Sequence, residues 1–178
     1  MKKQTAVAAL LVLVALSISA QEQDKSKRPS PSGTAQLTFA DGKKVTVDYS
    51  RPFAKGRKIY GGLVPYDQVW RTGANEATSL KTDADLAIGG TTVPAGSYTL
   101  FTVPSAGSWK LVINKQTGQW GTNYDQSQDL ARVDMNPTSL SQPVEQFTIS
   151  FDKTGGDSGK LNLDWEKTRS SVDVKEKK

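Results

Sequence analysis

Hydrophobic and polar residues alternate along most of the chain after residue 33, and this pattern predicts β-strands. Leu37 and Phe39 share one face of the first such stretch, and residues 45–49 continue the alternation. A period of two residues is typical of strands with one buried face. The Asp41-Gly42 pair between these stretches predicts a hairpin whose two central residues have positive φ.

The same alternation recurs to the end of the chain. It is found over residues 86–88, 91–93, 109–114, 147–151, 161–165 and 172–174. Residues 97–103 carry apolar side chains on both faces, which predicts a central strand covered on both sides. Helical periodicity reaches no further than a single turn, for example near Gln126. The pattern therefore predicts an all-β fold, an antiparallel β-sandwich resembling a jelly roll with about nine to ten strands.

The first residues of the chain are typical of an export signal. Lys2 and Lys3 precede an apolar run over residues 6–16, and small residues follow it up to Ala20. The run is shorter than the about 20 apolar residues that span a bilayer. It therefore predicts a secretory signal peptide over residues 1–20 rather than a transmembrane helix, and an exported protein in the periplasm or outside the cell.

The remainder is predicted to hold one domain. Residues 21–33 are polar and include two prolines, which predicts a flexible leader. A single β-sandwich domain is expected over residues 34–174, followed by a charged tail over residues 175–178. The absence of cysteine means that this domain must fold without disulfides.

The charge distribution argues against a nucleic-acid partner. The net charge is +5, and it falls to +3 when the predicted signal peptide is removed with its two lysines. Basic residues cluster only near the ends, at residues 25–28 and 175–178. No basic face is therefore expected on the folded part.

Composition also limits the chemistry. The chain contains neither histidine nor cysteine, which removes the usual general base and the nitrogen and sulfur ligands of transition metals. No stretch matches a calcium-binding loop or a phosphate-binding glycine loop. The sequence thus predicts no catalytic residue, no metal and no cofactor.

Two segments break the alternation, residues 50–78 and residues 115–129. Both are rich in glycine and polar residues, and long irregular connections of this kind are usually binding loops when they are ordered. The candidate ligand-binding residues all come from the first segment: Arg51, Lys55, Arg57, Tyr66, Trp70, Arg71, Asn75 and Glu76. Arginine can hold a carboxylate or phosphate through two hydrogen bonds, and aromatic rings can stack on a sugar.

Three interpretations of these residues stay open. The first is a binding or envelope-associated module with a polar cleft for an anionic or carbohydrate ligand. The second is a glycan hydrolase with two carboxylates, Glu76 and either Asp67 or Asp125. The third is a purely structural network that holds an irregular loop lacking ladder partners.

The longest motifs resemble those of a known family. The stretches YSRPFAKGRKIYGGLVPYDQVWRTGANEAT (residues 49–78) and PAGSYTLFTVP (residues 94–104), with WGTNYD and VEQFTISF, closely resemble the bacterial family named domain of unknown function 2911. The resemblance runs from about Gly33 to Val174. It implies an exported protein, and it implies no activity.

Overall fold

The computed structural model describes residues 28–178, and within this range the chain forms nine strands and one 3-10 helix. The strands are β1 (Ser32–Thr38), β2 (Lys44–Ser50), β3 (Thr78–Thr82), β4 (Leu86–Ile88), β5 (Thr91–Val93), β6 (Gly96–Pro104), β7 (Trp109–Asn114), β8 (Asp129–Lys153) and β9 (Ser158–Glu176). The helix, η2, covers Gln126–Gln128. The predicted signal peptide lies outside the described residues.

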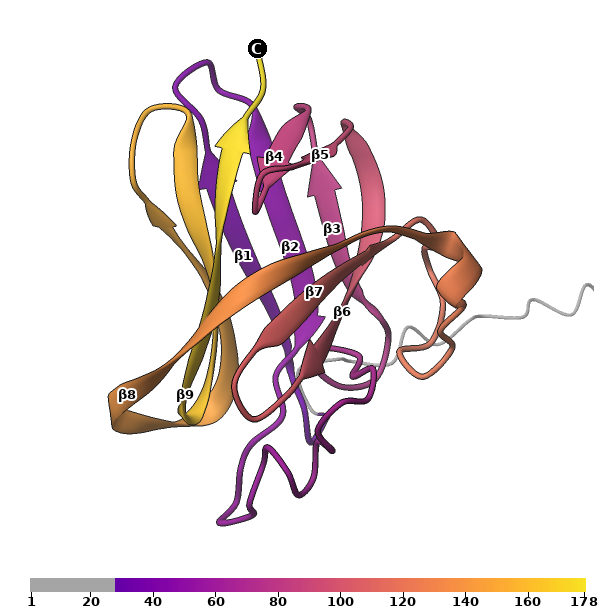
Figure 1. Ribbon diagram of the computed structural model, residues 1–178, viewed down its shortest axis with the longest axis vertical. Coiled ribbons are helices and arrows are strands. Elements are labelled where there is room, and N and C mark those ends of the chain that lie inside the picture. The colour runs from indigo at the N-terminus through magenta and orange to yellow at the C-terminus, as the bar shows by residue number, and fades with distance from the viewer. Residues whose placement is uncertain (1–27) are drawn as a thin grey trace, which may run out of the picture.

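All strand pairs are antiparallel, and together they form one open sheet in the order β1-β2-β3-β6-β7-β8-β9-β4-β5 (Figure 1). The all-β prediction is therefore confirmed, and the strand number matches its lower bound. The predicted sandwich of two separate sheets, arranged like a jelly roll, is not shown, because hydrogen bonds connect all the described strands. No helix between residues 28 and 178 is long and apolar enough to cross a membrane.

Strand β8 makes the sheet continuous, because it pairs with β7 along one part of its length and with β9 along the other. Residues 129–135 pair with β7, and residues 136–153 pair with β9 on the other edge of the same strand. Register shifts interrupt the second ladder on both sides of Val144. Figure 1 shows β8 crossing the molecule at a slant between the two groups of strands that it joins.

The predicted apolar stripes form one core. Leu161, Leu163 and Trp165 of β9 are each about 1% exposed, as their alternation predicts. The intervening Asn162 and Asp164 are also buried, and hydrogen bonds offset the cost of burying them. Asn162 Nδ2 donates to Asp152 at 2.8 Å, and the Arg169 guanidinium donates to Asp164 at 2.6 and 2.8 Å.

The predicted β1–β2 hairpin is confirmed, but its predicted turn type is wrong. Gly42 has a positive φ of 91°, whereas Asp41 does not have a positive φ. The connection runs from residue 39 to residue 43 and is closed by the Phe39 N–H donating to the Lys43 carbonyl at 2.9 Å. A longer loop needs only one left-handed residue, and glycine supplies it.

Both ends of the described chain contact the domain. Residues 21–27 of the predicted leader lie outside the described residues, and β1 begins at Ser32, before the predicted domain start at Thr34. At the other end β9 continues to Glu176, whose buried side chain accepts a hydrogen bond from Lys43 Nζ at 2.7 Å. Glu176 is thus part of the sheet, where the sequence suggests a solvated tail.

Replacing Trp165 by alanine tests the core. The indole is fully buried and contacts Trp70 and Phe147. Trp165→Ala should lower the free energy of unfolding by about 3–5 kcal/mol, because it leaves a large cavity. Guanidinium denaturation measures this loss. Leu130→Ala, at a site that is 37% exposed, is the control and should change stability by less than about 0.5 kcal/mol. Equal stability of the two variants would contradict the described core.

Candidate functional site

The irregular segment between β2 and β3, residues 51–77, fills an open strand edge. Strand β3 pairs with β6 only as far as Leu100, so the next residues of β6 need other partners. Trp70 N–H donates to the Thr102 carbonyl at 2.7 Å, and Thr102 N–H donates to the Trp70 carbonyl at 2.9 Å. Asp67 N–H donates to the Pro104 carbonyl at 2.8 Å. The loop thus satisfies backbone groups that β3 leaves unpaired.

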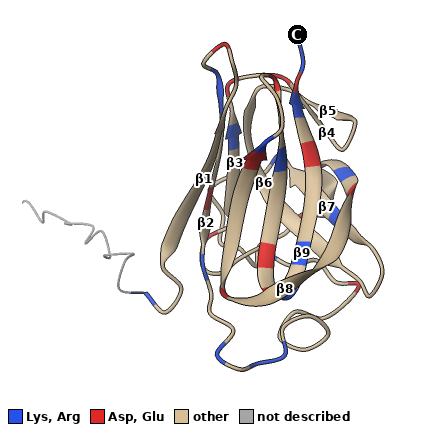
Figure 2. Ribbon diagram, turned by 90° about the vertical axis from the view of Figure 1, so that its left-hand side faces the viewer, with Lys and Arg blue, Asp and Glu red and all other residues tan. Residues whose placement is uncertain are grey.

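The start of the same loop pairs with β8. Ala54 N–H donates to the Glu145 carbonyl at 2.8 Å, and Phe147 N–H donates to the Pro52 carbonyl at 2.8 Å. Loop 51–77 is therefore attached to β8 as well as to β6. Figure 1 shows its middle part extending below the sheet, and Figure 2 shows basic residues on that part.

Aromatic side chains fix the loop to the core. The Trp70 ring stacks on Trp165 with centroids 5.8 Å apart and meets the edge of Phe147 at 5.1 Å. Tyr60 is 7% exposed and meets the edge of Trp109 at 4.6 Å. Such pairs contribute about 0.5–1.5 kcal/mol each beyond the area that they bury.

The second irregular segment lies beside the first. Ala77 N–H donates to the Gln119 carbonyl at 3.1 Å, and Gly121 N–H donates to the Asn75 carbonyl at 2.9 Å. A Cβ atom at Gly121 would lie 2.7 Å from Arg71 Cδ. The lack of a side chain at Gly121 therefore leaves room for the Arg71 side chain.

The backbone between Arg71 and Asn75 is strained. Thr72 is fully buried with φ of 52°, and Asn75 has φ of 59°. Left-handed conformations of this kind cost of order 1–3 kcal/mol and persist only where the surroundings impose them. Thr78 Oγ1 donates to the Thr72 carbonyl at 2.7 Å, and the Thr72 hydroxyl is hydrogen-bonded to that of Thr102 at 3.2 Å.

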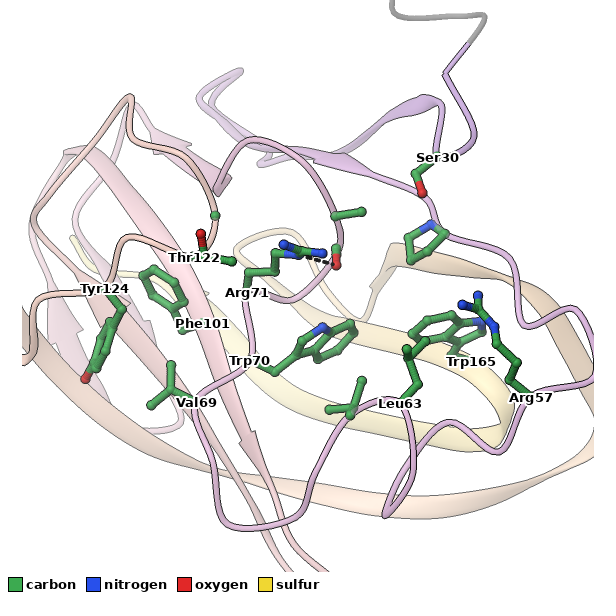
Figure 3. A pocket seen from close by; sticks show the side chains of 15 residues that line it. Ser30, Arg57, Leu63, Val69, Trp70, Arg71, Phe101, Thr122, Tyr124 and Trp165 are labelled. Carbon is green, nitrogen blue, oxygen red and sulfur yellow. Dashed lines mark hydrogen bonds between the residues drawn. The ribbon is translucent and has the colours of Figure 1, made fainter.

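These contacts border a pocket of about 450 Å³ (Figure 3). Its apolar and aromatic walls include Leu63, Val69, Trp70, Phe101, Tyr124 and Trp165. Its polar lining includes Ser30, Arg57, Arg71 and Thr122. No aspartate or glutamate of residues 28–178 lines it.

The charge in the pocket is positive. Arg71 Nε donates to the Gly73 carbonyl at 3.3 Å, and Arg57 donates to the carbonyls of Ala54 and Phe53 at 2.9 and 2.6 Å. Neither guanidinium forms an ion pair with any described residue. Burial and the hydrogen bond to Asp129 raise the pKa of Tyr124 to about 12, so this wall residue stays neutral at ordinary pH.

Comparison with known proteins identifies the family. A family model described as a protein of unknown function (DUF2911) matches residues 30–174. The chain belongs to the DUF2911 family. The matched range of this DUF2911 protein begins at Ser30, which lines the pocket, and includes both irregular loops. No curated protein and no solved structure matches the chain.

Of the candidate residues in the DUF2911 protein, Arg57, Trp70 and Arg71 meet at the pocket. Figure 3 shows the rings of Trp70 and Trp165 between Arg71 and Arg57 in this view. The Arg71 guanidinium donates to the Gly73 carbonyl. Arg57, Trp70 and Arg71 come from two separate parts of loop 51–77, and Trp165 comes from β9.

Three other candidates lie outside this pocket. Arg51 donates to the Phe147 carbonyl at 3.3 Å and to Thr148 Oγ1 at 3.1 Å, against β8. The Lys55 side chain is exposed and forms no ion pair within the described range. Tyr66 is 39% exposed and lines a different pocket.

Asn75 and Glu76 are engaged in holding the chain together. Asn75 Nδ2 donates to the Ser30 carbonyl and to Ser50 Oγ, both at 3.2 Å. Both oxygens of Glu76 lie 2.8 Å from a nitrogen of Arg28. The structural interpretation accounts for these two residues, because they tie the segment before β1 to the loop.

Sequence reasoning missed several lining residues. Phe101 belongs to a predicted core strand. The apolar residues on both faces of that strand indicated that its second face is covered, but not that Phe101 lines a pocket. Gly121 and Thr122 lie in the second irregular segment, which was predicted to be a binding loop, but neither residue was a candidate. Val69 and Leu63 carried no signal beyond their position in the first loop. Within residues 28–178, no cluster of acidic side chains suits a metal ion.

Two replacements of Asn75 separate its hydrogen bonds from its backbone. Asn75→Ala removes the contacts to Ser30 and Ser50 and places a Cβ residue without a polar side chain at φ of 59°. Asn75→Gly removes the same contacts but tolerates that φ. Asn75→Ala should cost about 1–3 kcal/mol of unfolding free energy, and Asn75→Gly should cost less. Urea denaturation measures both variants, and a larger loss for glycine would refute the assigned backbone role.

Proposed function

We propose that this DUF2911 protein is an exported binding module that holds a small anionic ligand in the pocket between Arg57 and Arg71. The observation that carries the proposal is the pair of guanidinium groups, without acidic partners in the described range, on the lining of a pocket with aromatic walls. Functional pockets commonly combine an apolar lining with a few placed polar groups.

The side chains define the chemistry of the ligand. A guanidinium carries five N–H donors and binds carboxylate or phosphate through paired hydrogen bonds. Arg71 uses Nε for the Gly73 carbonyl, which leaves its terminal nitrogens for a ligand. Trp70, Phe101 and Tyr124 offer ring surface to an apolar body. We therefore favour a carboxylate that bears an apolar or sugar ring over a bare inorganic anion.

The surroundings of Arg57 and Arg71 strengthen their attraction for an anionic ligand. Both arginines act in a site that is partly enclosed by protein, where charges interact more strongly than in open water. Glu76, the next acidic residue after Arg71 in the sequence, is paired with Arg28. A ligand anion therefore meets little competition from the protein's own carboxylates.

The hydrolase alternative has less support. A glycosidase mechanism needs two carboxylates facing one ligand, and no described acidic side chain lines the pocket. The proposed activity of Glu76 would also require this residue to leave Arg28. Binding without catalysis fits the lining better.

Isothermal titration calorimetry with three probes tests the proposal: phenylacetate, glucuronate and inorganic phosphate. At least one of the two carboxylates should bind more tightly than phosphate, because only they offer a ring to the aromatic wall. Arg71→Ala should weaken that binding about tenfold or more, since a charged hydrogen bond contributes about 1.5–3 kcal/mol. Higher ionic strength should weaken it as well.

Lys55→Ala is the matched control. It removes the same charge from the same loop, but Lys55 does not line the pocket. Its affinity for the carboxylate should equal that of the unaltered protein. Failure of both carboxylates to bind, or an equal loss in Lys55→Ala and Arg71→Ala, would overturn the assignment of this pocket.

A further inference from the structure

A second pocket, of about 310 Å³, shares no lining residue with the pocket between Arg57 and Arg71. Tyr60 and Tyr66 of loop 51–77 line it, with Ser105 from the β6–β7 turn, Ser139 from β8 and Thr168 from β9. Four separate parts of the fold thus bring hydroxyl groups to one place.

The second pocket is neutral. No lysine, arginine, aspartate or glutamate of the described chain lines it. A hydroxyl both donates and accepts hydrogen bonds, and the hydroxyls of Tyr66, Ser139 and Thr168 form none with any described residue. The lining therefore suits a ligand that is itself rich in hydroxyl groups and carries no charge.

Tyr60 adds an unsatisfied group to the wall of this pocket. Its Oη is buried and has no hydrogen-bond partner within residues 28–178. Burial raises the pKa of Tyr60 far above its usual range, so the hydroxyl keeps its proton. A buried hydroxyl without a partner costs about 1–3 kcal/mol, and such groups are rare enough to need an explanation.

Tyr66 supplies an aromatic surface at the same pocket. A Cβ atom at Gly61 would lie 2.7 Å from Tyr66 Cε2, so the ring rests directly on that glycine. The residue is nevertheless 39% exposed. A ring that is supported on one side and exposed elsewhere can stack on the C–H face of a sugar, because tyrosine combines an apolar body with a polar tip.

We propose that this second pocket binds one neutral hexose ring of a glycan, stacked on Tyr66 and hydrogen-bonded to Ser139 and Thr168. The volume lies at the lower end of the range for small-molecule sites, about 300–1,000 Å³, which suits a single ring. The proposal does not depend on the anion pocket, since the two linings have no residue in common.

Saturation-transfer NMR with the methyl glycosides of glucose, mannose and galactose tests this proposal. At least one glycoside should receive saturation from the full domain at millimolar concentration. Tyr66→Ala should raise its dissociation constant at least threefold, through loss of the stacking surface. The double variant Ser139→Ala/Thr168→Val should do the same through loss of hydrogen bonds. Melting temperatures show whether each variant is folded. If one of the two variants does not fold, the other is sufficient to test the proposal.

Arg71→Ala is the control that separates the two pockets, and it should leave glycoside binding unchanged. The proposal is overturned if no glycoside receives saturation. It is also overturned if glycoside binding is unchanged in the folded Tyr66 and Ser139/Thr168 variants, or if Arg71→Ala weakens it as much as Tyr66→Ala does. Loss of carboxylate binding alone bears on the first pocket and not on this one.

Discussion

The loop between β2 and β3 lies against the sheet because two strand edges would otherwise be unpaired. Strand β6 continues past the end of its ladder with β3, and residues 145–147 of β8 fall in an interruption of its ladder with β9. An unpaired and buried backbone group costs about as much as a lost hydrogen bond. Loop 51–77 meets both needs through Trp70 and Ala54. Its position is therefore set by the strand edges together with the packing of its own Tyr60 and Trp70.

This attachment divides the polar residues of the loop into two groups. Asn75 and Glu76 bond to the segment before β1, and Thr72 is held from both sides. Among residues 28–178, Arg57 and Arg71 bond only to carbonyl groups of their own loop. Buried hydrogen bonds compensate the backbone strain at Thr72. In the described chain, no acidic side chain neutralises the charge of Arg57 or Arg71. We therefore expect the charges of Arg57 and Arg71 to contribute little to folding.

The alternation of apolar residues predicted most of the strands, because one buried face leaves a period of two in the sequence. It named no strand for β3 (residues 78–82) or for residues 129–146 of β8, where Pro137 and Pro143 interrupt the pattern and the ladder shifts register. That strand also joins the two strand groups into one sheet, a connection that periodicity does not encode. The site was predicted as a loop, but which arginines share a pocket depends on distant partners such as Phe101 and Gly121. The residue types indicated the chemistry of the site, but tertiary contacts determine which of the candidate residues line the pocket.

The central claim is that Arg57 and Arg71 are not needed for the fold. Guanidinium denaturation of the double variant Arg57→Ala/Arg71→Ala measures this directly, without knowledge of any ligand. The free energy of unfolding should fall by less than about 1 kcal/mol, because both side chains are at least partly exposed and, within the described chain, bond only to loop carbonyls. A loss above about 3 kcal/mol would show that the arginines hold the loop in place, and it would contradict the account.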